Sequence, residues 1–137
     1  MSAGLTKTTV VSTGQGKYQQ KIQAGPHVII ADEPRSLGGE GTGATPISLL
    51  LGALGSCTAI TLQMYAGRKE LPLTGVDVFL SHEKRGDRDH IDREIIIHGA
   101  ALTPEQRQRM MQIADMCPVH KMLSGTADIS TRERLSE

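Results

Sequence analysis

Residues 46–66 read PISLLLGALGSCTAITLQMYA, and they lie within a segment that has no charged residue between Glu40 and Arg68. Thr45 can cap the free amides of a helix, and Pro46 suits the first helical position because its missing N–H is not needed there. A helix is therefore predicted from Pro46 to about Gly67. Since apolar residues occur on nearly every side of it, this helix is expected to be the buried centre of the fold.

The length and composition of this helix also allow a membrane span. Five polar residues and the absence of an aromatic belt argue against that alternative: Ser48, Ser56, Thr58, Thr61 and Gln63. We therefore favour a core helix and expect no membrane partner. Its predicted core face is formed by Leu50, Ala53, Leu54, Cys57, Ile60, Thr61 and Met64, whereas the small residues Gly52, Ser56 and Ala59, with Gln63, form a stripe that a second backbone can approach.

Strand patterns lie on both sides of the helix. Before it, Thr6–Thr13, Lys17–Ala24 and His27–Ala31 are predicted strands, followed by a glycine-rich segment from Asp32 to Ala44 that is expected to be a mobile loop. After it, we expect strands at Thr74–Lys84 and Ile91–His98, helices at 104–116 and 118–123, and a last strand at 127–132. Because strands and helices are segregated, the order βββαββααβ predicts one α+β domain over residues 1–137 with a largely antiparallel sheet.

Charge and length exclude several classes of protein. The chain has 137 residues, and its 15 basic residues balance 15 acidic ones. It therefore lacks the basic surface with which nucleic-acid-binding proteins attract phosphate, and no nucleic-acid partner is expected. The N-terminal sequence shows no secretory signal, so a reducing cytoplasmic location is expected for the thiols.

The two cysteines are the candidate nucleophiles. Cys57 lies inside the central helix, where apolar burial disfavours the thiolate and an inert core residue is the alternative. Cys117 precedes Pro118 and lies where a new helix begins, so free amides and the helix dipole favour its thiolate. If the two sulfurs meet, peroxide can oxidise Cys57 to a sulfenic acid, and Cys117 can condense with it to a disulfide.

A zinc site is a second possibility for these cysteines. His120 follows Cys117 with two residues between them, and Cys57 would supply a third ligand. No further Cys-x-x-Cys or His-x-x-x-His element is present, so we expect no metal and no cofactor. His120 is instead expected to lie at a surface, near enough to tune a thiol.

Two motifs resemble the signature of OsmC/Ohr proteins. The first is the glycine-rich loop with LLLGALGSCT at residues 49–58, and the second is LTPEQ at 102–106 followed by ADMCPVHK at 114–121. The resemblance implies an intertwined homodimer in which sheets enclose the cysteine helices. It also implies a thiol peroxidase for organic hydroperoxides, with Cys57 as the peroxidatic cysteine, Cys117 as the resolving cysteine and a dithiol as the reductant.

The match to the peroxidatic members is incomplete. They use an Arg to hold the thiolate and a Glu to orient that Arg, but Ile47 stands where the Glu is expected. Arg35 is the upstream candidate for the cation and Glu40 for its partner. A non-enzymatic dimer that senses redox state or binds a small molecule is therefore the alternative function.

Overall fold

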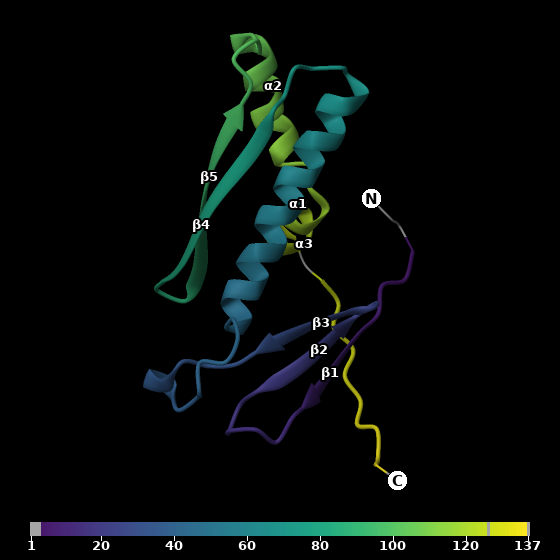
Figure 1. Cartoon of the computed structure of the whole chain (residues 1–137), viewed down its shortest axis with the longest axis vertical. Coiled ribbons are helices and arrows are strands. Elements are labelled where there is room, and N and C mark those ends of the chain that lie inside the picture. The colour runs from purple at the N-terminus through teal and green to yellow at the C-terminus, as the bar shows by residue number, and fades with distance from the viewer. Residues whose placement is uncertain (1–3, 126, 137) are drawn as a thin grey trace. The chain divides into compact units, whose positions relative to one another are not determined.

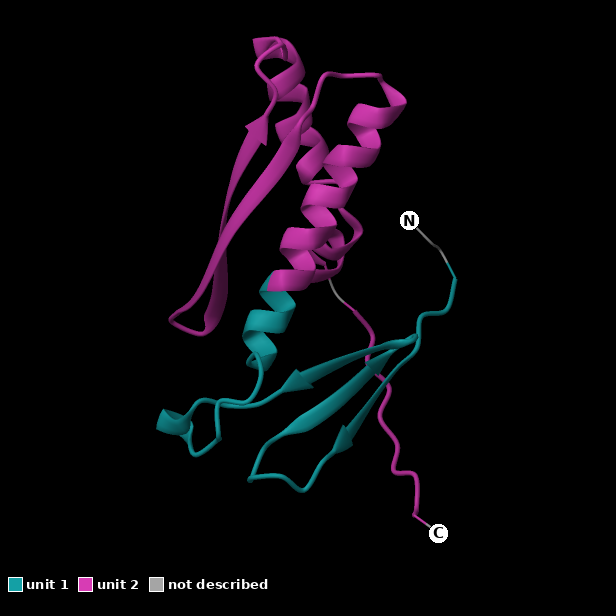
Figure 2. Ribbon diagram, in the orientation of Figure 1, with its two compact units in different colours: residues 1–51 teal, residues 52–137 magenta. Residues whose placement is uncertain are grey.

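The computed structural model describes residues 4–125 and 127–136. Internal contacts divide the chain into two compact units, residues 1–51 and residues 52–137 (Figure 2). The single domain expected from the sequence stays a prediction.

The first unit is built on a three-stranded antiparallel sheet in the order β1-β2-β3 (Figure 1). Its strands are β1 (Thr8–Ser12), β2 (Gln20–Ala24) and β3 (His27–Ala31). Ile22 of β2 pairs with Val10 on one side and Ile29 on the other. The predicted strands are thus confirmed, but β2 begins three residues late because residues 14–18 form the turn.

The glycine-rich segment after β3 is bonded to a buried carboxylate. Asp32 accepts hydrogen bonds from the amides of Glu33 at 2.7 Å, Glu40 at 3.3 Å and Thr42 at 3.1 Å, and from the Thr42 hydroxyl at 2.6 Å. Gly39 packs so tightly on the Glu33 carbonyl that a Cβ would lie 2.0 Å from its oxygen. The segment was expected to be a mobile loop, but these bonds and the short 3-10 helix Arg35–Leu37 (η1) make it a fastened loop.

The second unit combines a long hairpin with helices. Helix α1 (Pro46–Arg68) begins in the first unit and continues into the second, and its predicted start at Pro46 is confirmed. Strands β4 (Gly75–Arg85) and β5 (Arg88–His98) pair in antiparallel fashion around a tight turn at Gly86, whose positive φ of 65° suits glycine. Helices α2 (Pro104–Ala114) and α3 (Pro118–Ser124) follow.

One face of α1 packs into the core of this unit. The main core cluster joins α1, β5 and α2 through Leu62, Ala66, Ile97, Leu102, Met110, Ile113 and Ala114. Gly55 lets α1 approach β4 closely, because a Cβ there would lie 2.8 Å from a Leu80 methyl carbon. The sequence prediction of the α1 core face was partly wrong, since Leu50, Ala53, Ile60 and Met64 are exposed, Ile60 by 40% and Met64 by 46%.

The last predicted strand is not formed. Residues 127–132 have no strand structure, and they are exposed. A strand exists only where a neighbouring strand supplies hydrogen bonds, and no strand among the described residues pairs with this segment. Helix α2 also ends at Ala114, two residues before the predicted end.

By length and composition, helix α1 could cross a membrane. Of its most apolar 18 residues, 28% are buried inside this chain. A helix at the core of a soluble protein passes the same test, so this feature is weak evidence for a span.

Candidate functional site

The two cysteines meet in the second unit. Cys57 comes from the middle of α1, and Cys117 is the residue that caps the N-terminus of α3. Cys57 is 4% exposed and Cys117 is 0% exposed, and both belong to a small cluster with Leu54. Leu80, Ile91 and Val119 pack against this cluster. Two residues that are 60 positions apart in the sequence thus form a pair of buried thiols.

Burial is the largest influence on Cys57, and it raises the pKa of this thiol. A hydrogen bond to Cys117 raises the pKa further, because it holds the proton on the Cys57 sulfur. The amide of Val119 and the hydroxyl of Thr61 bond to the Cys57 sulfur and lower its pKa, but they do not outweigh burial. Cys57 is therefore held mainly as a thiol by its own chain.

The Cys117 sulfur accepts a hydrogen bond from the His120 amide at 3.3 Å. This bond is the side-chain cap of α3, whose first residue is Pro118. The predicted position of Cys117 at a helix start is therefore confirmed. The cap also fixes the direction of the Cys117 side chain toward the thiol cluster.

Arg93 of β5 was not predicted as a site residue, and it bonds to both segments that carry the cysteines. Its guanidinium donates to the Thr58 hydroxyl at 3.0 Å, to the Asp115 carboxylate at 2.8 Å and to Nδ1 of His120 at 3.1 Å. Only 12% of the Arg93 side chain is exposed. A signal was available, because Arg93 interrupts the inward row of Ile91, Ile95 and Ile97 on a strand that alternates its faces.

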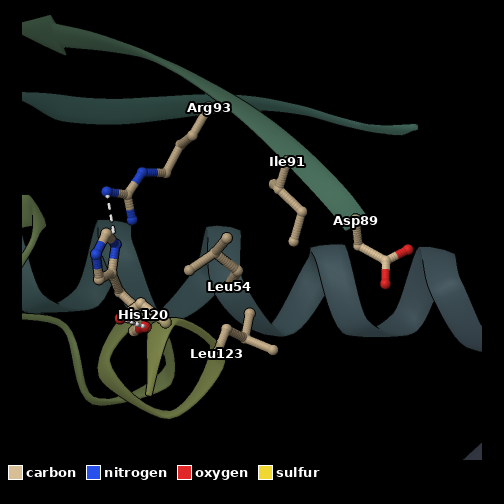
Figure 3. A pocket seen from close by; sticks show the side chains of 7 residues that line it. Leu54, Asp89, Ile91, Arg93, His120 and Leu123 are labelled. Carbon is tan, nitrogen blue, oxygen red and sulfur yellow. Dashed lines mark hydrogen bonds between the residues drawn. The ribbon is translucent and has the colours of Figure 1, made fainter. Parts of the chain in front are cut away.

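A pocket of about 310 Å³ adjoins the thiol cluster (Figure 3). Leu54, Ile91 and Leu123 form its apolar part, and Arg93 and His120 lie together at one end. Leu54 lines the pocket and belongs to the cysteine cluster, and Ile91 lines the pocket and packs against that cluster. Asp89 and Ser124 also line the cavity, which is therefore a mixed apolar and polar site beside a redox-capable thiol pair.

The other predicted site residues belong to the first unit. Arg35 opens the 3-10 helix η1, and Glu40 lies five residues later in the fastened loop. Both are exposed, and neither forms an ion pair with any described residue. Their roles as cation and orienting carboxylate stay predictions, as does the effect of Ile47 at the start of α1.

The zinc alternative finds no support in the described ranges, where no three His, Cys, Asp or Glu side chains gather around one point. Nδ1 of His120 is occupied by Arg93 instead. Since a guanidinium can only donate, Nδ1 accepts, and a neutral His120 carries its proton on Nε2.

Comparison with known proteins identifies the family of this chain. The family model described as OsmC-like protein matches residues 39–132, which include both cysteines and Arg93. The chain belongs to the OsmC family. No curated protein sequence matches it.

Solved structures of the family share the fold. An OsmC-like protein from Mycoplasma pneumoniae is similar with a TM-score of 0.75 and 17% identity, over 91% of both chains. The organic hydroperoxide resistance protein OhrB of Bacillus subtilis has a TM-score of 0.62 and 19% identity, over 93% of this chain and 96% of that one. An organic hydroperoxide resistance protein from Legionella pneumophila has a TM-score of 0.65 and 17% identity, over 93% and 95%. The predicted OsmC-like α+β fold is thereby confirmed.

Proposed function

We propose that this OsmC-family protein is a thiol peroxidase that reduces organic hydroperoxides through Cys57 and Cys117. The observation that carries the proposal is the burial of both thiols in one cluster beside a partly apolar pocket. Two relatives of the same fold are named for organic hydroperoxide resistance, which supports the same substrate class.

The reaction needs no group beyond the peroxide and a reductant. The Cys57 thiolate attacks the terminal peroxide oxygen, the O–O bond breaks, and the alkoxide takes a proton and leaves as an alcohol. Cys57 is then a sulfenic acid. The Cys117 thiolate attacks the Cys57 sulfur, an S–S bond forms, and the hydroxyl leaves as water. A dithiol reductant restores both thiols by exchange and becomes a disulfide itself.

The pocket suits the organic part of such a substrate. A cavity of about 310 Å³ holds a small organic molecule, and its Leu54, Ile91 and Leu123 side chains favour an alkyl or aryl group over water. Hydrogen peroxide has no apolar group to bury. Organic hydroperoxides are therefore the expected substrates.

The protein is expected to act as a cytoplasmic homodimer. Ile60 and Met64 on α1 and Phe79 on β4 are 40%, 46% and 53% exposed in the single chain. Large apolar side chains of this kind favour association when they are gathered on one surface. A second copy of the chain would cover the exposed side of α1.

A redox sensor or small-molecule binder is the second candidate function. The raised pKa of Cys57 favours it, because a protonated thiol reacts slowly with peroxide. A sensor needs one oxidation event, whereas a peroxidase must turn over.

A steady-state assay separates the two candidates. Cumene hydroperoxide and hydrogen peroxide are supplied in turn with dihydrolipoamide, dithiothreitol or glutathione as reductant. The proposal predicts many turnovers with the organic peroxide and a dithiol, and none for Cys57→Ser. A single oxidation with no turnover under any of these reductants favours the sensor and contradicts the proposal.

A further inference from the structure

Arg93 connects the two segments that carry the cysteines. Thr58, which receives one of its hydrogen bonds, is the residue after Cys57 on α1. Asp115 and His120, which receive the other two, lie two residues before and three residues after Cys117. A single guanidinium on β5 therefore bonds to both of the segments that carry the cysteines.

Each partner of Arg93 is in turn bonded to its own segment. The Thr58 hydroxyl donates to the Leu54 carbonyl one turn earlier on α1 at 2.7 Å. The His120 amide donates to the Cys117 sulfur, while the His120 ring accepts from Arg93. Asp115 is the C-terminal cap residue of α2 and leads into the short link before Cys117. Displacement of Arg93 would therefore remove a hydrogen bond from each of the two segments.

The burial of this network gives it weight. Thr58 is fully buried, and most of the Arg93 side chain is covered. A charged guanidinium on the inward face of a strand loses its hydrogen bonds to water. Its planar N–H donors compensate for this loss only when several acceptors surround them. Lysine cannot reproduce this arrangement, because its single ammonium has no planar fork.

We propose that Arg93 is a positioning residue that holds Cys117 against Cys57 by fastening both cysteine-bearing segments to β5. Its effect falls on the second chemical step, in which the Cys117 thiolate attacks the Cys57 sulfenic acid, the S–S bond forms and water leaves. When Cys117 is held less firmly, a second peroxide molecule oxidises the sulfenic acid to sulfinic acid before the disulfide closes. This part of the inference rests on the proposed peroxidase function.

Two measurements on the full-length protein test the role of Arg93. The first is the ratio of sulfinic acid to disulfide by intact mass after excess cumene hydroperoxide, and the second is the dithiol–disulfide equilibrium in dithiothreitol redox buffers. For Arg93→Gln we expect the mass ratio to rise about tenfold. We also expect the equilibrium to shift about tenfold toward the dithiol, which equals about 30 mV for a two-electron couple. Arg93→Lys should lie between Arg93→Gln and the wild type.

Matched variants separate positioning from general stability. Arg88→Gln changes an exposed arginine on the same strand and should behave as the wild type. Thr58→Val removes the acceptor for Arg93 at nearly constant shape, whereas Thr58→Ser keeps the hydroxyl. Thr58→Val should shift the mass ratio and the redox equilibrium in the same direction as Arg93→Gln. Thr58→Ser should leave both at the wild-type values.

Wild-type ratios and equilibria in Arg93→Gln would overturn the inference. Should that variant not fold, identical values for Thr58→Val and Thr58→Ser would overturn it equally. The redox-buffer equilibrium uses no peroxide. If the wild type does not react with hydroperoxide, the proposed function therefore fails while the role of Arg93 is still decided.

Discussion

Cys57 must combine burial with reactivity. Its burial raises the pKa of the thiol, so the thiolate that attacks peroxide is scarce at neutral pH. The amide of Val119 and the hydroxyl of Thr61 offset this only in part. The peroxide step should therefore accelerate as the pH rises.

Alkylation of Cys57 with iodoacetamide measures this thiolate directly. In Cys117→Ala, where only Cys57 can react, the midpoint of the rate against pH should lie above the ordinary thiol value, because burial remains after Cys117 is removed. A thiol whose folded-state pKa is raised contributes stability below its unfolded pKa and loses it as the pH rises through the folded value. The free energy of unfolding should therefore fall over that alkaline range. A midpoint below the ordinary thiol value would contradict this environment for Cys57.

Arg35→Ala in the same background tests the cation predicted from the sequence. If Arg35 lies near the sulfur in the assembled protein, its removal shifts the alkylation midpoint further upward. An unchanged midpoint would exclude Arg35 as the activating cation.

Asp32 is the residue that fastens the glycine-rich loop. Its hydrogen bonds to Thr42 and to the amides of Glu33 and Glu40 lower the pKa of its carboxyl. Its stabilising effect is therefore present at neutral pH and is lost as the pH falls through this lowered value. Asp32→Asn should speed hydrogen exchange at the amides of Glu40 and Thr42 at neutral pH. Exchange at the wild-type rate would show that the carboxylate does not hold the loop.

At the scale of the elements, capping signals were the most reliable guide. Thr103 and Gln106 form the predicted capping box of α2, with bonds of 3.1 and 2.9 Å. The predicted start of α3 after Cys117 also holds. These signals are local, because the bonds that they predict join residues only three positions apart.

The missing last strand shows the limit of such patterns. The alternation of apolar and polar residues at 127–132 favours a strand, but a strand forms only beside another strand that bonds to it. Arg93 escaped selection for a related reason, because its partners Thr58, Asp115 and His120 lie 22 to 35 residues away in the sequence. The motifs identified both cysteines, and the isoleucine row around Arg93 marked that residue as unusual, but only the fold shows which residues it bonds to.

The capping box provides a prediction for α2. Thr103→Ala should lower the free energy of unfolding by about 1 kcal/mol, because the amide of Gln106 loses its acceptor. Thr103→Ser keeps an acceptor and should lose much less. Denaturant unfolding of the two variants measures the difference, and equal stabilities would contradict the contribution of the cap.

At the scale of the whole molecule, the exposed side of α1 requires an explanation. A homodimer would cover Ile60 and Met64 without a membrane, in agreement with the family resemblance. Sedimentation in detergent-free buffer should give a dimer, and Ile60→Glu should shift it toward monomer. Gln108→Glu adds the same charge at an exposed residue of α2 and is the comparison for charge alone. A stable wild-type monomer, or a protein that requires detergent, would contradict this account.

Intact mass after treatment with cumene hydroperoxide tests the central claim most directly. The wild type should lose about 2 Da as the Cys57–Cys117 disulfide forms, whereas Cys117→Ser should gain multiples of about 16 Da as Cys57 passes to sulfenic and sulfinic acid. Cys57→Ser should keep its mass. A disulfide-free wild type, or oxidation that persists in Cys57→Ser, would contradict peroxide reduction by this thiol pair.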